Sequence, residues 1–166
     1  MKKIKNGLFC MLALVCLAAV VYLFNGQNNM PAPKSTVLYD VIRVIDGDTF
    51  VVDLDGTEER VRLIGVDAPE SVHPDQSKNV PQGKTASAYM NDLLAGKKIA
   101  LEFDIQERDK YGRLLAYAYL DGNMVNLLLL ESGNARLATY PPNVKYVDRF
   151  RKAQEQAQKE KIGLWG

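Results

Sequence analysis

Five short segments that favour extended backbone dominate the chain between residues 37 and 120. They span residues 37–45, 49–54, 59–66, 99–105 and 113–120. Each is rich in β-branched or aromatic residues and is bounded by turn-forming residues, which is typical of strands joined by tight connections. Asp55-Gly56, between the second and third segments, is a strong signal for a two-residue hairpin. The pattern predicts a small closed barrel.

Three other segments carry apolar residues at helical spacing. They span residues 84–94, 124–131 and 145–161, and a glycine follows each of them. In the last segment, Tyr146, Phe150, Ala153 and Ala157 share one face, so we expect this helix to have a structural role. Strands and helices together predict an α+β fold, mainly β. The expected architecture is a five-stranded oligonucleotide-binding (OB-fold) barrel with about three helices, preceded by an N-terminal apolar segment.

Residues 1–24 form this apolar segment. Lys2, Lys3 and Lys5 precede residues 8–24, a run without a charged side chain. The run is long for the core of a signal peptide and short for a membrane span, so a cleaved signal peptide and a retained membrane anchor stay open. Both alternatives place the rest of the chain outside the cytoplasm. We expect it to be secreted or, through residues 8–24, anchored to the outer face of the cytoplasmic membrane.

A polar segment with two prolines, residues 25–35, is interpreted as a linker to a folded domain of residues 36–166. Both cysteines, Cys10 and Cys16, precede the linker, so the domain has no disulfide. Four of the 21 basic residues precede residue 36 but none of the 20 acidic ones does, which gives the domain 17 basic and 20 acidic residues and a formal charge of −3. This charge argues against a purely electrostatic nucleic-acid binder, so placed arginines and a cation must hold any anionic ligand.

Acidic residues and an arginine recur where the predicted strands end. Asp46 and Asp48 flank a glycine before the second strand, Arg62 lies in the third, and Asp67 and Glu70 follow it. Carboxylates that a sheet directs to one place bind a hard cation, and an arginine beside them binds phosphate oxygens in pairs. Taken alone, each of these features is explained by a turn or by a solvent-exposed strand end. Their joint occurrence indicates metal-assisted attack on a phosphodiester.

The single histidine, His73, lies in a polar loop that contains proline. One histidine excludes mechanisms that need two. The loop context predicts an exposed side chain rather than a ligand of substrate or metal.

Three stretches of the chain and its last residues match one enzyme family in order. They are residues 44–49 (VIDGDT), 62–70 (RLIGVDAPE), 109–113 (DKYGR) and 159–165 (KEKIGLW). With these residues the chain resembles the staphylococcal nuclease (thermonuclease) family over residues 37–165. The resemblance implies an OB-fold barrel with three helices and a calcium-dependent endonuclease that acts on DNA and RNA and leaves 3′-phosphates.

The resemblance also implies roles for individual residues. Asp48 and Asp67 match the calcium carboxylates, and Ala68 matches a residue that binds the metal through its backbone carbonyl, where the family often has threonine. Asp46 is expected to support the metal site without binding the ion. We expect the protein to act as a monomer.

Catalytic and substrate-binding roles follow from the same comparison. Arg62, Glu70 and Arg113 match the three catalytic positions, with Glu70 as a general base or as a residue that positions water. Lys110, Tyr111 and Tyr140 resemble residues that hold the phosphate and sugar of the nucleotide. Two rival hypotheses are a noncatalytic nucleic-acid-binding OB-fold module, against which these site residues argue, and a calcium-stabilised adhesion module, which would not need the arginines.

Overall fold

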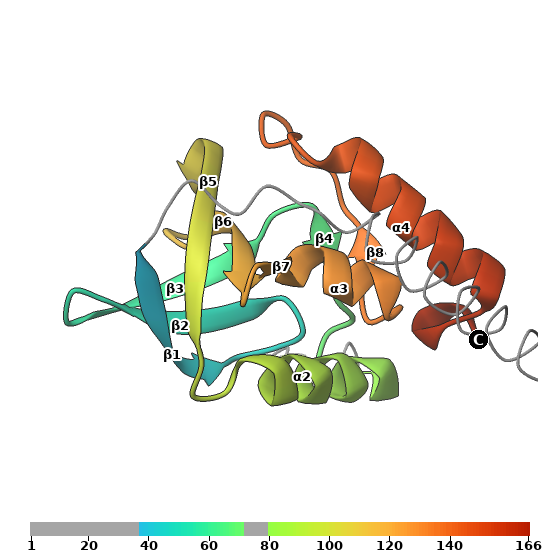
Figure 1. The fold of residues 1–166 in the computed structure, drawn as a ribbon, viewed down its shortest axis with the longest axis horizontal. Coiled ribbons are helices and arrows are strands. Elements are labelled where there is room, and N and C mark those ends of the chain that lie inside the picture. The colour runs from blue at the N-terminus through green and yellow to red at the C-terminus, as the bar shows by residue number, and fades with distance from the viewer. Residues whose placement is uncertain (1–36, 72–79) are drawn as a thin grey trace, which may run out of the picture. The chain divides into compact units, whose positions relative to one another are not determined.

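The computed structural model of the chain describes residues 37–71 and 80–166. Five of its strands form the predicted barrel (Figure 1): β1 (Leu38–Val44), β2 (Thr49–Leu54), β3 (Thr57–Leu63), β5 (Lys98–Arg108) and β6 (Leu114–Leu120). They pair antiparallel in the order β3-β2-β1-β5-β6, and a parallel pairing of β3 with β6 closes the barrel. The predictions for residues 1–24, for the linker 25–35 and for His73 fall outside the described residues.

Local sequence explains the first strands. In β3, Val61 and Leu63 are buried and Arg60 is exposed, as alternation along a strand requires. The predicted hairpin between β2 and β3 forms at Asp55-Gly56, with φ of 54° and 85°. Positive φ at both central residues matches the right-handed twist of the flanking strands. The five-stranded barrel predicted from the sequence is therefore confirmed.

One predicted strand, residues 59–66, is interrupted in the structure. β3 ends at Leu63, and the chain turns at Gly65, where φ is +78°. A Cβ atom at Gly65 would lie 2.6 Å from Cε2 of Phe150, so a side chain would be both strained and crowded there. After this turn, β4 (Val66–Asp67) leaves the barrel and pairs with β8 (Arg136–Leu137). The break is what directs Asp67 away from the barrel sheet.

The three predicted helices are present with shifted ends. They are α2 (Pro81–Leu94), α3 (Val125–Glu131) and α4 (Val147–Glu160). α2 begins at Pro81 rather than at residue 84, because proline suits the first position of a helix. α4 ends at Glu160 and not at Gly163, since Lys161 takes the left-handed conformation, with φ of 55°. Before α3, the two-residue strand β7 (Asn123–Met124) extends the sheet beside β6.

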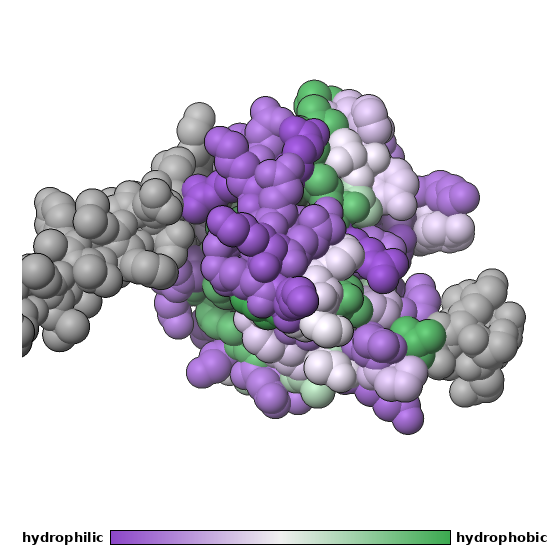
Figure 2. Space-filling model, turned by 90° about the vertical axis from the view of Figure 1, so that its right-hand side faces the viewer, coloured by the Kyte–Doolittle hydropathy of each residue, from purple (hydrophilic) through white to green (hydrophobic). Residues whose placement is uncertain are grey.

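The helices cover different parts of the barrel (Figure 1). α2 lies across one end, and α3 lies between the barrel and α4. Phe150 and Ala157 of α4 are buried, which confirms the structural role predicted for this helix. Figure 2 views the side on which α4 and the C-terminus lie, and hydrophilic residues cover most of its described surface. In the part of the chain that the structure describes, no helix is long and apolar enough to cross a membrane.

A polar cluster joins β5 to the start of α4. Glu102 accepts hydrogen bonds from the hydroxyls of Tyr119 (2.7 Å) and Tyr146 (3.0 Å) and pairs with the Lys145 ammonium. Burial alone would raise the pKa of Glu102, but the donors on Lys145, Tyr119 and Tyr146 outweigh it and hold the pKa below 4.5. The ionised Glu102 therefore fastens the segment before α4 to the barrel.

Glu102→Gln should lower the free energy of unfolding at neutral pH by about 1–3 kcal/mol, because three donors lose a charged acceptor. A carboxylate whose pKa is lower in the folded than in the unfolded protein stabilises the fold at pH values above its unfolded pKa. This stabilisation is lost as the pH falls through its folded pKa. The difference from wild type should therefore shrink below pH 4.5. Urea unfolding at several pH values measures it, with the exposed neighbour Glu107→Gln as the matched control.

Candidate active site

Arg62 is the central residue of the site. Its Nη1 donates to the backbone carbonyls of Val66 (2.7 Å) and Leu63 (3.2 Å). The same guanidinium lies 3.0 Å from Oδ2 of Asp48 and 2.9 Å from Oδ1 of Asp67. The turn at Gly65 brings these carbonyls and Asp67 around the end of β3. The structure thus places Arg62 in direct contact with both predicted metal carboxylates.

Asp48 lies directly before β2 and is buried, with 5% of its surface exposed. Its Oδ2 accepts a hydrogen bond from the backbone N–H of Ala68 (2.8 Å), and its Oδ1 accepts one from the hydroxyl of Thr49 (3.0 Å). Asp46 supports it through the backbone, since Asp46 Oδ1 accepts a hydrogen bond from the Asp48 N–H (3.1 Å). A supporting role for Asp46 is consistent with this turn.

Burial raises the pKa of Asp48 to about 7. Arg62 opposes this rise, nearby Asp46 adds to it, and the Ala68 amide opposes it. A buried carboxylate beside a second one is a group whose ionised form an additional cation would stabilise.

Gly47 allows three segments to meet around Asp48. A Cβ atom at this position would lie 2.6 Å from Cβ of Ala68 and 2.8 Å from Cβ of Ala86 in α2. Contacts this short do not occur between real Cβ atoms. Glycine is therefore required here for close packing of the Asp46–Asp48 turn against Ala68, which follows β4, and against α2.

Glu70 is not joined to this cluster. Its backbone carbonyl accepts a hydrogen bond from Val80 N–H (3.1 Å) and lies against Gly83 of α2, while its side chain is exposed. Among the described residues, the Glu70 carboxylate has no hydrogen-bond or ion-pair partner. The structure brings the backbone of Glu70 near the site, and its predicted role in proton transfer stays a prediction.

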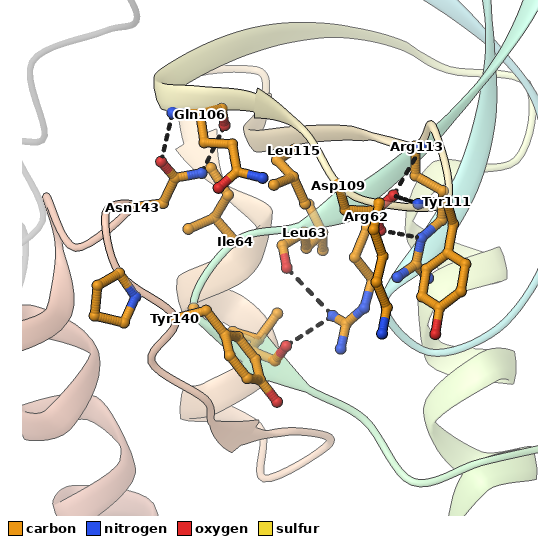
Figure 3. A pocket seen from close by; sticks show the side chains of 14 residues that line it. Arg62, Leu63, Ile64, Gln106, Asp109, Tyr111, Arg113, Leu115, Tyr140 and Asn143 are labelled. Carbon is orange, nitrogen blue, oxygen red and sulfur yellow. Dashed lines mark hydrogen bonds and ion pairs between the residues drawn. The ribbon is translucent and has the colours of Figure 1, made fainter.

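A pocket of about 470 Å³ opens beside Arg62 (Figure 3). Five of the residues predicted to contact substrate line it: Arg62, Lys110, Tyr111, Arg113 and Tyr140. Tyr111 and Tyr140 are 73% and 70% exposed, so both rings are free to contact a ligand. In Figure 3 the two rings lie on opposite sides of the Arg62 guanidinium. The pocket is polar at its guanidinium groups and aromatic at its rim, which suits a nucleotide.

Arg113 is oriented by Asp109, for which the sequence suggested no role. Its Nε donates to Asp109 Oδ2 (2.7 Å), and Asp109 Oδ1 accepts from the backbone N–H groups of Tyr111 and Arg113. Burial alone would raise the pKa of Asp109, but the Arg113 side chain and these amides hold it below its ordinary value. The Nη groups of Arg113 are left for a ligand, and its guanidinium lies 5.6 Å from the Tyr111 ring centre.

Asn143 is a second residue that the sequence did not single out. It is buried, its Oδ1 accepts from Gln106 N–H (2.8 Å), and its Nδ2 donates to the Gln106 carbonyl (2.7 Å). Its own N–H donates to the Tyr140 carbonyl (3.2 Å). Asn143 thereby fastens the turn that carries Tyr140 to β5. From the sequence alone, Asn143 is predicted only to be a turn residue that follows Pro142.

The oxygen atoms present fit a hard divalent cation. Asp67 Oδ2 has no hydrogen-bond partner among the described residues. The Arg62 guanidinium pairs with Oδ2 of Asp48, and Oδ1 of Asp48 is hydrogen-bonded to Thr49 instead. Two carboxylates held at one arginine, with the Ala68 carbonyl next in the chain, match the ligand preference of calcium. In residues 37–71 and 80–166, no three acidic, histidine or cysteine side chains gather as a metal site. Water and substrate would have to supply the other ligands.

Fold and site together define a small OB-type barrel that presents arginines, carboxylates and exposed tyrosines along one edge. The family described as staphylococcal nuclease homologue matches residues 60–166. The chain is 43% identical to the thermonuclease of Staphylococcus hyicus and 42% identical to that of Staphylococcus intermedius, over 99% of both chains in each case. It is also 43% identical to endonuclease YncB of Bacillus subtilis, over 84% of this chain and 67% of that one.

The chain belongs to the staphylococcal nuclease family. The predicted resemblance is confirmed, and so, at the level of homology, is the predicted enzyme class, an endonuclease of the thermonuclease type. The roles of individual residues remain predictions that the geometry makes specific.

Proposed function

We propose that the protein is a calcium-dependent, sugar-nonspecific endonuclease that hydrolyses phosphodiester bonds of DNA and RNA and leaves 3′-phosphates. The observation that carries the proposal is the contact of one guanidinium, that of Arg62, with both Asp48 and Asp67, while Arg62 also lines the pocket. The names of the relatives support the same class of reaction.

Each group has a task that its chemistry suits. Arg62 and Arg113 bind oxygens of the scissile phosphate bidentately and stabilise the negative charge that grows on them. Glu70 accepts the proton of a water molecule that attacks phosphorus, while the bond from phosphorus to the 5′-oxygen breaks and that oxygen takes up a proton from solvent water. Asp48, Asp67 and the Ala68 carbonyl would hold calcium, which supplies positive charge beside the phosphate.

The substrate-binding side chains explain tolerance of both sugars. Lys110 attracts phosphate, and Tyr111 and Tyr140 offer aromatic faces on which a sugar or base can stack. Stacking and charge do not depend on a 2′-hydroxyl, so DNA and RNA both fit.

Calcium should support cleavage of plasmid DNA, magnesium should support much less, and a chelator should abolish it. Two carboxylates and a carbonyl leave several positions to water and substrate, which suits flexible calcium better than strictly octahedral magnesium. Plasmid relaxation with each ion and with chelator measures this. Equal rates with both ions, or cleavage in chelator, would exclude the proposed metal site. Binding without cleavage in every condition would favour a noncatalytic binding barrel.

We also propose that residues 1–24 serve export and that residues 36–166 act outside the cytoplasm. The support is the sequence pattern of lysines before an uncharged apolar run. The protein should be recovered from the culture medium, or from membranes with its domain open to protease added outside the cells. Its mass distinguishes a cleaved from a retained segment. Recovery of active protein only from the cytoplasm would contradict the proposal.

A further inference from the structure

A second hollow, of about 320 Å³, adjoins the site on the side of Asp67. It is lined by Asp67, Pro69, Val80, Gln82, Arg136 and Leu164. Arg62 lines the first pocket and Asp67 lines this one, and the 2.9 Å contact of their side chains joins the two walls. None of the roles predicted for substrate binding uses this hollow.

Arg136 lines this second hollow. In the β4–β8 ribbon Arg136 is the direct partner of Asp67, and side chains of paired residues lie on the same face of a ribbon. Arg136 nonetheless makes no ion pair among the described residues, since Asp67 is bound to Arg62 instead. Arg62 and Arg113, in contrast, both have carboxylate partners. Arg136 is therefore an exposed cation, next to the site, whose charge no carboxylate of residues 37–71 and 80–166 neutralises.

The guanidinium of Arg136 is held by an aromatic ring. It lies 5.6 Å from the ring centre of Trp165, within the range of a cation–π contact. Trp165 belongs to the 3₁₀ turn η2 (Gly163–Trp165), which is fixed by a hydrogen bond from Leu164 N–H to the Gly133 carbonyl (2.9 Å). An arginine over a ring keeps its edge N–H groups free for phosphate oxygens. Pro69, Val80 and Leu164 provide apolar surface for a sugar.

We propose that this hollow is a second nucleotide subsite, in which Arg136 binds the phosphate that neighbours the scissile one along a single strand. The inference rests on the proposed function and extends it, because an enzyme that cuts within a strand must accommodate chain on both sides of the cleaved bond. The nucleotide on one side lies at Tyr111 and Tyr140. The nucleotide on the other side lies between α2 and β8.

Salt dependence tests the proposal. With single-stranded oligothymidylate and calcium, the full-length Arg136→Gln protein should show a slope of log kcat/KM against log salt that is shallower by about 0.7, the value for one lost phosphate contact. Arg136→Lys should keep the wild-type slope, since it keeps the charge. Arg151→Gln, which removes an exposed arginine from α4, should leave the slope unchanged.

Short substrates locate the contact. The dinucleotide TpT has one phosphodiester, and pTpT and TpTp each add a phosphate on one side. One of the two additions should raise kcat/KM of the wild type by on the order of tenfold through Arg136, and Arg136→Gln should lose that gain. A wild-type salt slope in Arg136→Gln, together with the same gain from the added phosphate as in the wild type, would overturn the subsite. If the wild type cleaves no polynucleotide, the proposed function fails, and the salt dependence of equilibrium binding of oligothymidylate still tests Arg136.

Discussion

Replacement of Arg62 by lysine should lower kcat for polynucleotide cleavage by on the order of 10²-fold or more, the cost of removing one preorganised donor to a growing negative charge. A lysine ammonium keeps the positive charge but cannot make two parallel hydrogen bonds to phosphate. Lysine also cannot reproduce the simultaneous contacts of Arg62 with Asp48, Asp67 and the carbonyl of Val66. We therefore expect some loss of stability as well, and the assay must be run well below the unfolding temperature.

Arg60→Lys is the matched control, because Arg60 lies on the same strand with an exposed side chain. Its kcat should stay within a few-fold of the wild-type value. Arg113→Lys should resemble Arg62→Lys, with a smaller effect on stability, since Asp109 is the one ion-pair partner of Arg113 in the described chain. Steady-state kinetics separate kcat from KM for each variant. Wild-type kcat in both Arg62→Lys and Arg113→Lys would show that these guanidinium groups are not catalytic.

Glu70→Gln should lower kcat by on the order of 10²–10⁴-fold if Glu70 is the general base. Glutamine keeps the size and the hydrogen-bonding capacity of glutamate but cannot accept the proton. The Glu70 side chain is exposed and its backbone is held by Val80 and α2, so the substitution should leave thermal unfolding unchanged. The Glu70 carboxylate makes no hydrogen bond or ion pair with Arg62 or Arg113.

The size of the loss distinguishes two roles for Glu70. A general base must accept a proton, which glutamine cannot do, so its loss should lower kcat by on the order of 10²-fold or more. If Glu70 only positions water, glutamine should largely retain that function. The Glu70→Gln substitution should then lower kcat by no more than a few-fold. A kcat within a few-fold of wild type for Glu70→Gln and for both arginine variants would show that none of these three side chains is catalytic.

The barrel strands and the helices could be predicted from the sequence because their signals are local. Alternating residues such as Arg60, Val61 and Arg62, and the Asp55-Gly56 turn, depend on contacts between near neighbours in the chain. The ends of elements were less predictable. Lys161 ends α4 in a left-handed conformation that its residue type does not favour, and Gly65 breaks a predicted strand because Phe150 packs against it.

The candidate site was likewise predictable from the sequence only in part. The residue types, their order and the family pattern in the sequence predicted which carboxylates, arginines and tyrosines belong to the site. Only the tertiary structure showed that Arg62 joins Asp48 to Asp67, that Asn143 fastens the Tyr140 turn to β5, and that Arg136 lies opposite Asp67. These contacts join residues far apart in the chain. They depend on how β4 leaves the barrel and pairs with β8, and no local pattern in the sequence specifies that pairing.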